Sequence, residues 1–382
     1  KTRSPWGPRL PWILWSAIPL GIAMAMMWWL PPGSLWAKFG IFLAISVVAN
    51  SLYTCVNLPY SALAAELTTD TGLRTRLNTA RFTGSIIAGL VGIVLGGLLL
   101  QNHQDASSYF KVGVLSGAII TVFTLICAWG IAPAARNCQR PNSQKGSTRR
   151  LLRRVRENGR FMKVLGLYLM LWCALQIMQT AALIYLPVVM RLPESWSNWI
   201  LLPFQISTLV GLQIWNRYSH RRGRIASLHR GTALWIGGCL LAMVLIPLDA
   251  DLSPVGSWAN GLRLAALLVT IMVVGLGAST AYLIPWALLP DAIDADPEKP
   301  AGLYSAWMVF TQKICISLAL FFFGNLMSLS GYVAAKGIVQ PDNALIAIRL
   351  CMGVIPATLV VLGLIVMRRW PNRGAHLLQA QP

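Results

Sequence analysis

Long apolar stretches follow one another along this 382-residue chain and constrain its fold more than any other feature of the sequence. A helix needs about 20 mainly apolar residues to cross the ~30 Å hydrocarbon core of a bilayer. Ten stretches meet this requirement, and breakers such as Pro31-Pro32-Gly33 and Pro371 separate them. They cover residues 11–30, 36–62, 78–101, 110–135, 164–187, 198–215, 226–248, 262–290, 303–328 and 344–367. The pattern predicts an all-α integral membrane protein with ten transmembrane helices.

Charged residues are scarce and clustered. They make up 12% of the chain, about half of the ~25% that is usual in soluble domains. This composition excludes a soluble enzyme, a disordered protein and a secreted disulfide scaffold. The seven cysteines form no CxxC motif, and most lie inside the apolar stretches, where they behave as small apolar residues.

No motif of an enzyme or a metal site occurs, since the four histidines lack ligand spacing and HExxH, GxSxG and P-loop patterns are missing from the sequence. The nearest candidate is the acidic triplet Asp291, Asp294 and Asp296, which could imitate the Mg²⁺-binding acids of a membrane prenyl transferase. Such enzymes need a second acidic cluster, and the sequence around Glu66 and Asp70 is poor in acids. We therefore expect no enzyme, no resident metal and no cofactor.

Lys and Arg predict the orientation in the membrane, because cytoplasmic loops are enriched in them. Twenty-four of the 32 fall in every second connection and at the two ends, which places both ends of this chain in the cytoplasm. The formal charge of +20 then faces the cytoplasmic leaflet, and we expect no nucleic-acid partner. Residues 149–160, RRLLRRVRENGR, are either a basic surface helix on anionic lipid or a plain charged linker.

Two pairs of similar segments indicate an internal repeat. PYSALAAELTTD from Pro59 matches PWALLPDAIDAD from Pro285, and Gly7 in a basic loop matches Gly223 in another. The offsets are nearly equal, as in transporters built from two parallel halves. The predicted domains are a four-helix bundle (1–135), a basic cytoplasmic linker (136–163), a six-helix bundle (164–368) and a cytoplasmic tail (369–382).

The repeat also predicts helices beyond the given chain. Two helices, 164–187 and 198–215, precede the basic loop of the second half, whereas the chain begins in the matching loop of the first half. Equivalent halves would have twelve helices in all, of which four and six are present. We therefore expect two helices encoded upstream of Lys1, the second with an Asp near the middle of the membrane.

Several motifs in order now carry a family resemblance. KTRSPWGPRLPWIL, PYSALAAELTTDTGLRTRLNTARF and IPWALLPDAID, followed by GLYSAWMVFTQKICISLAL, resemble segments of the glycoside–pentoside–hexuronide:cation symporters. These form the melibiose-carrier-like branch of the major facilitator superfamily. The resemblance covers essentially the whole chain. It implies a monomeric transporter of the bacterial plasma membrane that works by alternating access, coupled to Na⁺ or H⁺.

Candidate site residues follow from charges in the apolar stretches and from the resemblance. Lys313 lies well inside the apolar stretch 303–328, where a charge is costly to bury without a role or a partner. By the resemblance, it also matches the Lys beside the family's cation site. Arg81 matches an Arg that contacts substrate in the family, although its side chain could instead reach the cytoplasmic face. Thr54 could lend an oxygen to a cation or bond its own helix. Asn57 and Ser61 stand where the sugar carriers have an Asp and a Trp.

The loop charges suggest a cytoplasmic gate. All twelve acids lie in loops or at helix ends. Salt bridges between charges of the first half and those of the second could close the cytoplasmic side, and exposed pairs worth ~0–1 kcal/mol would reopen easily. The alternative is solvated charge without a gating role. The gate residues would be Glu66, Asp70, Arg74 and Arg76 opposite Asp291, Asp294 and the basic loop 217–224.

Three functions remain open at this point. The resemblance favours cation-coupled symport of a sugar or glycoside. A lysophospholipid or another amphiphile is the second possibility, because vertebrate relatives carry lysophospholipids and two sugar-carrier features are replaced at Asn57 and Ser61. The third is a truncated remnant that does not transport, since the expected cation carboxylates are not in the given sequence.

Overall fold

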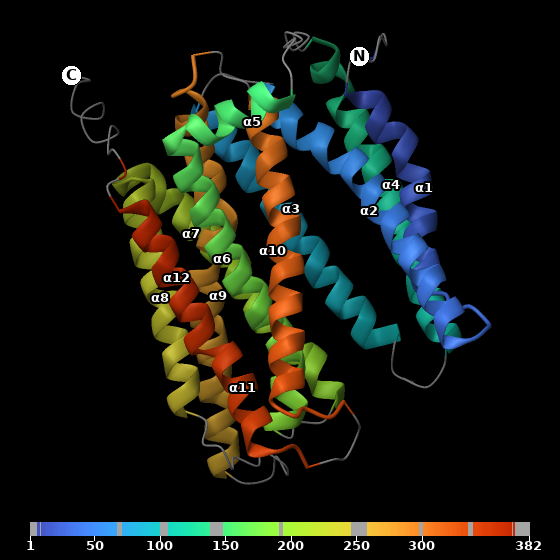
Figure 1. Ribbon diagram of the computed structural model, residues 1–382, viewed down its shortest axis with the longest axis vertical. Coiled ribbons are helices and arrows are strands. Elements are labelled where there is room, and N and C mark those ends of the chain that lie inside the picture. The colour runs from blue at the N-terminus through green and yellow to red at the C-terminus, as the bar shows by residue number, and fades with distance from the viewer. Residues whose placement is uncertain are drawn as a thin grey trace. The chain divides into compact units, whose positions relative to one another are not determined.

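Every regular element among the residues that the computed structural model describes is a helix (Figure 1). These are 6, 7, 9–66, 71–99, 106–137, 148–190, 194–245, 258–297, 301–334, 339–368 and 370. The chain divides into two compact units, each of which is described by itself. The N-terminal unit comprises residues 1–74, 91–148 and 301–306, and the C-terminal unit comprises 75–90, 149–300 and 307–382.

The N-terminal unit is organised around one short helix. Helix α1 (Leu10–Met26) packs against α2 (Leu35–Glu66) and α4 (Ala106–Asn137). Gly21 and Gly117 let the α1 and α4 backbones meet, because a Cβ at either position would overlap the other helix. The Thr121 hydroxyl donates to the carbonyl of Ala17 at 3.3 Å across the same contact. Small residues thus bring these two helices together, as is common in bilayers.

The C-terminal unit is the larger one and its central helix is α9 (Trp258–Ile293), which packs against α6, α7 and α8. Gly277 lies directly against the backbone of α8 near Trp235. Half of the most apolar part of α9 is buried. The other elements are α5 (Thr148–Glu157), α6 (Gly159–Ile184), η1 (Tyr185–Val189), α7 (Glu194–Arg222), α8 (Arg224–Leu245), α10 (Ala301–Leu329), α11 (Asp342–Met352) and α12 (Val354–Met367). Helix α3 (Thr71–Leu99) contributes residues 75–90 to this unit.

Two irregularities interrupt apolar stretches that the sequence presents as continuous. Pro187 lies in η1, a π-helical turn, since proline cannot donate to the regular ladder. Gly353, with φ −115° and ψ −83°, ends α11 and precedes α12. The last predicted segment, 344–367, is therefore two helices joined at a glycine.

Each predicted segment overlaps one of these helices or, for the last, two. Among the described residues, seven helical spans are long and apolar enough to cross a membrane: 35–61, 79–99, 107–133, 159–189, 261–293, 302–329 and 342–367. Helix α1 is apolar but shorter. An all-helical membrane protein is thus confirmed. The count of ten spans and the bounds of the four predicted domains remain predictions.

Candidate functional site

The candidate site of the C-terminal unit begins with Arg81. Its guanidinium lies over the ring of Trp286 on α9, 4.4 Å from the centroid, and 4.7 Å from the ring of its neighbour Phe82. Phe82 itself is 8% exposed, and its ring centroid lies 6.3 Å from that of Trp286. Stacking on an aromatic face stabilises a guanidinium by about 0.5–2 kcal/mol, more where water is excluded. Arg81 is therefore directed at α9, rather than at a loop.

Aromatic side chains of α6 extend the platform under Arg81. Tyr168 packs against both Trp172 and Trp286, at 5.6 and 6.2 Å between centroids. Trp172 meets Tyr282 edge to face at 5.1 Å. The spacing of four residues between Tyr168 and Trp172, and between Tyr282 and Trp286, places each pair on one helix face. One helix face of α6 and one of α9 thus form a continuous aromatic wall.

This wall holds two buried hydrogen-bond donors for which the described part of the chain offers no acceptor. Trp172 and Trp286 are 7% and 4% exposed. Neither indole N–H has a hydrogen-bond partner among the described residues. An unsatisfied buried donor costs about 1–3 kcal/mol, so such groups call for an explanation. Together with the Arg81 guanidinium, they would suit a ligand rich in oxygen acceptors.

Amide side chains lie around the aromatic wall. Gln213 on α7 donates to the Thr83 hydroxyl at 2.9 Å. Gln205 lies on the same helix, eight residues before Gln213, and is close to Gly89. A Cβ added at Gly89 would come within 3.2 Å of the amide nitrogen of Gln205. The buried carbonyl oxygen of Gln205 has no hydrogen-bond partner in the described part of the chain. Gln179 on α6 lies near the Tyr282 hydroxyl. The site therefore offers acceptors as well as donors.

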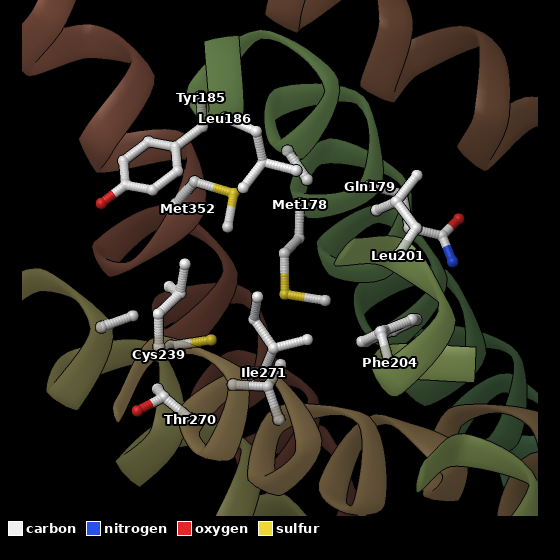
Figure 2. A pocket seen from close by; sticks show the side chains of 14 residues that line it. Met178, Gln179, Tyr185, Leu186, Leu201, Phe204, Cys239, Thr270, Ile271 and Met352 are labelled. Atoms are coloured by element: carbon white, nitrogen blue, oxygen red, sulfur yellow. The ribbon is translucent and has the colours of Figure 1, made fainter. Parts of the chain in front are cut away.

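An apolar pocket adjoins this polar and aromatic site (Figure 2). It holds about 650 Å³ of empty space, its open mouth included, and lies between α6, η1, α7, α8, α9 and α11. Gln179 belongs to both, since it lies near Tyr282 and also lines the pocket. Elsewhere the lining is almost wholly hydrocarbon and sulfur, including Met178, Leu186, Leu201, Phe204, Ile271 and Met352.

The cation-site candidates lie on two different helices. Lys313 is half-buried on α10, in the C-terminal unit. Thr54 is on α2, in the N-terminal unit, and its hydroxyl donates to the backbone carbonyl of Asn50 at 2.7 Å. This bond is the alternative that the sequence left open for Thr54. A role in ion coupling remains a prediction for both residues.

The substrate candidates of α2 bond one another. The Ser61 hydroxyl is buried and donates to Asn57 Oδ1 at 3.3 Å. Both belong to the N-terminal unit, whereas Arg81 belongs to the C-terminal unit. Their proposed contact with substrate is untested.

The gate residues are described only in part. Asp291 accepts two hydrogen bonds from Arg224, at 2.8 and 2.9 Å, and Arg224 belongs to the predicted basic loop. The side chains of Asp294 and Arg76 are exposed. Asp70 lies outside the described residues, as do the side chains of Glu66 and Arg74. The gate between halves therefore remains a prediction.

The basic segment does form a helix, α5, and part of it docks on the end of α9. Arg154 binds Asp296 through two nitrogens, one of them at 2.8 Å, and only 3% of the Asp296 side chain is exposed. Asn158 donates to the Ala292 carbonyl at 2.9 Å and also caps α6. Val155 is buried. On the other side, Arg153 is exposed and donates a hydrogen bond to Glu157. This bond, together with the charge of Glu157, raises the pKa of Arg153.

The sequence analysis missed the aromatic wall. It selected Arg81 but not Trp172, Tyr282 or Trp286, because aromatic residues are ordinary in apolar helices. One signal was available, since Trp286 directly follows Pro285 in the repeated motif. Gln179 and Gln205, two amides within apolar stretches, were a second signal.

Comparison with known proteins gives concordant results. A family described as MFS/sugar transport protein matches residues 1–372. An uncharacterized symporter of Synechocystis, sll1374, is 28% identical, the match covering 98% of this chain and 84% of the relative. The sodium-dependent lysophosphatidylcholine symporter 1-A of Danio rerio is 22% identical, covering 97% and 74%. The Escherichia coli inner membrane symporter YicJ is 24% identical, covering 99% and 80%.

Solved structures share the fold. A bacterial homologue of the iron transporter ferroportin in the outward-facing state has a TM-score of 0.64 at 14% identity, covering 95% of this chain and 84% of that one. The E. coli fucose:proton symporter FucP has a TM-score of 0.61 at 16% identity, with the same coverage. At such identities the likeness concerns the fold alone.

Proposed function

Since the chain belongs to the MFS/sugar transport protein family, we propose that it is a cation-coupled symporter whose substrate is held at the Arg81 site. Symporters among its relatives support secondary transport by symport. The protein is an integral membrane transporter and not an enzyme. The substrate and the ion are the parts that we propose here.

The observation that carries the proposal is the arrangement of donors around Arg81. A cation stacked on Trp286, beside two buried indole N–H groups without acceptors in the described chain, suits a polar group with several oxygens. Binding would satisfy donors that otherwise cost free energy. Alternating access around such a site would then carry the group across the membrane.

We propose a single-chain amphiphile as the substrate. Its head would bind at Arg81 and the aromatic wall, and its alkyl chain would enter the apolar pocket past Gln179 (Figure 2). Apolar cavities of this kind stay dry and take up apolar ligands. The lysophosphatidylcholine symporter of Danio rerio supports this class. Na⁺ is the proposed coupling ion, with H⁺ as the alternative. Of its two candidate residues we propose Lys313, because the Thr54 hydroxyl already bonds its own helix.

A sugar or glycoside is the second candidate, favoured by the aromatic wall itself. Sugar rings pack on indole faces and offer both donors and acceptors, which matches Trp172 and Trp286 together with the Gln179 amide near Tyr282. This candidate leaves the apolar pocket without a role.

Uptake into proteoliposomes separates the candidates. Protein in liposomes with an inward Na⁺ gradient, and separately with a pH gradient, is offered labelled lysophosphatidylcholine, dodecyl maltoside below its micellar concentration, and methyl glucoside. An amphiphile carrier accumulates the first two and not the third, and Ala182→Phe, which fills the pocket, abolishes this accumulation. Accumulation of methyl glucoside alone, unaffected by Ala182→Phe, would support the sugar carrier. No gradient-driven uptake of any probe would indicate a non-transporting protein and contradict the proposal.

We also propose that both ends of the chain face the cytoplasm of a bacterial plasma membrane, because positive charge gathers in alternate connections. In a cysteine-free background, labels at Lys145→Cys and His376→Cys should react only from the cytoplasmic side. A label at Ile338→Cys should react only from outside. The reverse pattern would refute this orientation.

Anionic lipid is the proposed partner of α5. Arg153 and Arg156 are exposed on the side away from the Arg154–Asp296 pair, and each such charge near an anionic surface contributes about 1 kcal/mol. Uptake should rise with the phosphatidylglycerol content of the liposomes in wild type and less so in Arg153→Gln/Arg156→Gln. The matched control, Lys111→Gln/Arg263→Gln, removes two exposed charges outside the predicted cytoplasmic connections and should respond like wild type. An equal response of all three proteins would contradict the lipid role.

A further inference from the structure

Two cysteines far apart in the sequence meet inside the C-terminal unit. The Cys173 thiol on α6 donates to the backbone carbonyl of Cys315 on α10, with 3.6 Å between sulfur and oxygen. The Cys315 thiol donates back to the carbonyl of Leu169 on α6, also at 3.6 Å. Each thiol therefore lies against the backbone of the helix that carries the other cysteine. Both side chains are buried, at 7% and 0% exposure.

The two cysteines lie close in the sequence to residues of the candidate site. Cys173 directly follows Trp172, which belongs to the aromatic wall, and Cys315 follows Lys313 by two residues. Helix α10 begins in the N-terminal unit, with residues 301–306, and continues in the C-terminal unit. A bond between the two sulfurs would therefore restrain α10 against the helix that carries part of the substrate site.

We propose that Cys173 and Cys315 form an oxidative modification site, at which a two-electron oxidant such as a diazene joins the sulfurs and fixes α6 to α10. Each thiol loses one hydrogen and one S–S bond forms. The two hydrogens and the electron pair pass to the N=N bond of the diazene, which becomes a hydrazine. A dithiol reductant reverses the reaction.

Geometry and solvation both favour this product. A disulfide needs an S–S distance of about 2 Å, and each sulfur already lies only 3.6 Å from a backbone oxygen of the helix that carries the other cysteine. The disulfide is neutral, whereas oxidation of a single buried cysteine to a sulfinate would place a charge among apolar groups at a cost of several kcal/mol. The pair should therefore be oxidised to the cross-link rather than to an acid.

Other cysteines of the chain provide matched controls. Cys239 on α8 and Cys351 on α11 are also buried, at 1% and 0% exposure. Cys239 lies beside Trp235, and Cys351 belongs to an apolar core cluster. Serine variants at these positions remove a buried thiol without touching the Cys173–Cys315 contact.

Cross-linking is measured in the full chain with a protease site inserted between residues 246 and 257, so that cleavage separates Cys173 from Cys315. Membranes are treated with diamide at pH 8.5, because the thiolate is the attacking species, then blocked with N-ethylmaleimide, cleaved and resolved without reductant. The two fragments should stay together in wild type, Cys239→Ser and Cys351→Ser. They should separate in Cys173→Ser and Cys315→Ser, and in the corresponding alanine variants if the serine proteins insert poorly. Separation in oxidised wild type, or a link that persists without Cys173, would overturn the site.

The effect on transport rests on the proposed function and is measured separately, as uptake of labelled lysophosphatidylcholine driven by Na⁺. Diamide should lower wild-type uptake at least tenfold, dithiothreitol should restore it, and Cys173→Ser should be insensitive. Full uptake by fully cross-linked protein would refute the restraint of α10 while leaving the cross-link in place. Absence of uptake before oxidation would count against the substrate proposal alone.

Discussion

The end of α2 and the end of α9 share a sequence motif but have different surroundings. In α9, Trp286 follows Pro285 and is 4% exposed. Half of the most apolar part of this helix is buried. In α2, Tyr60 follows Pro59 and is only partly buried. Only 11% of the most apolar part of this helix is buried. Trp286 lies under the Arg81 guanidinium, whereas Tyr60 packs beside the small core cluster of α1 and α4.

The backbone of the repeat is better preserved than its side-chain contacts. Gly7 before α1 has φ 85° and Gly223 before α8 has φ 92°, so both basic loops enter their helices through the left-handed conformation that favours glycine. The repeated Pro-aromatic segment, by contrast, packs beside a small core cluster in one unit and belongs to the aromatic wall in the other. A repeated motif therefore identifies equivalent positions of the chain, and the packing around each copy decides its function.

The largest expected difference between the units concerns ion coupling. Lys313→Ala in the C-terminal unit should abolish Na⁺-driven accumulation, because a charge at this depth is retained for a function or a partner. Thr54→Val in the N-terminal unit should change it less than threefold, since the Thr54 hydroxyl already bonds its own helix. Accumulation in proteoliposomes measures both.

Lys111→Ala, an exposed lysine of α4, is the control for the loss of a positive charge. All variants should insert in the membrane like wild type. Normal accumulation by Lys313→Ala would remove Lys313 from the coupling site, and a loss in Thr54→Val as severe as in Lys313→Ala would cancel the contrast between units.

The two aromatic residues of the motif should differ in stability. Trp286→Ala removes a buried side chain and should lower the free energy of unfolding by about 3–5 kcal/mol. Tyr60→Ala should cost about 1 kcal/mol, because Tyr60 is partly exposed. Denaturant unfolding in detergent gives both values. Similar losses would mean that the two copies of the motif are packed equally.

The two ion pairs at the end of α9 should also contribute unequally to the free energy of unfolding, but they should differ by less than the two aromatic residues. Asp296→Asn should cost about 2 kcal/mol, since its carboxylate is 3% exposed and doubly bonded to Arg154. Asp291→Asn should cost roughly 0.5 kcal/mol, because 38% of that side chain is exposed beside Arg224.

A double-mutant cycle with Arg154→Gln isolates the first pair from other effects of the substitutions. A coupling energy near zero between Arg154 and Asp296 would show that α5 is not held on α9 by this contact.

The smallest effect is expected within α2. Ser61→Ala removes one hydroxyl whose bond to Asn57 is long, at 3.3 Å, and should lower stability by about 0.5 kcal/mol. Amphiphile uptake should change less than twofold. A tenfold loss of uptake with unchanged stability would instead place Ser61 in the substrate site.

Much of the fold could be predicted from the sequence, because apolar length and breakers act locally. The predicted stretches overlap the helices, the basic segment forms α5, and Arg81 stood out as a charge in an apolar helix. The split at Gly353 was missed, because one glycine in an apolar run is common in membrane helices.

The contacts between helices could not be predicted. The partners Arg154 and Asp296, and likewise Cys173 and Cys315, lie 142 residues apart and meet only through the packing of α5 and α6 on other helices. The stacking of Arg81 on Trp286 likewise depends on where α3 meets α9. Periodicity shows which residues share a helix face, and it does not show what that face will contact.

Binding of lysophosphatidylcholine to the protein in nanodiscs, followed by calorimetry, tests the substrate site most directly. Arg81→Gln should weaken binding by about 10- to 100-fold, as expected when a charged hydrogen bond worth about 1.5–3 kcal/mol is lost. Arg76→Gln, an exposed arginine on the same helix, should bind like wild type. Equal affinities of Arg81→Gln and wild type would contradict the assignment of the site to Arg81 and Trp286.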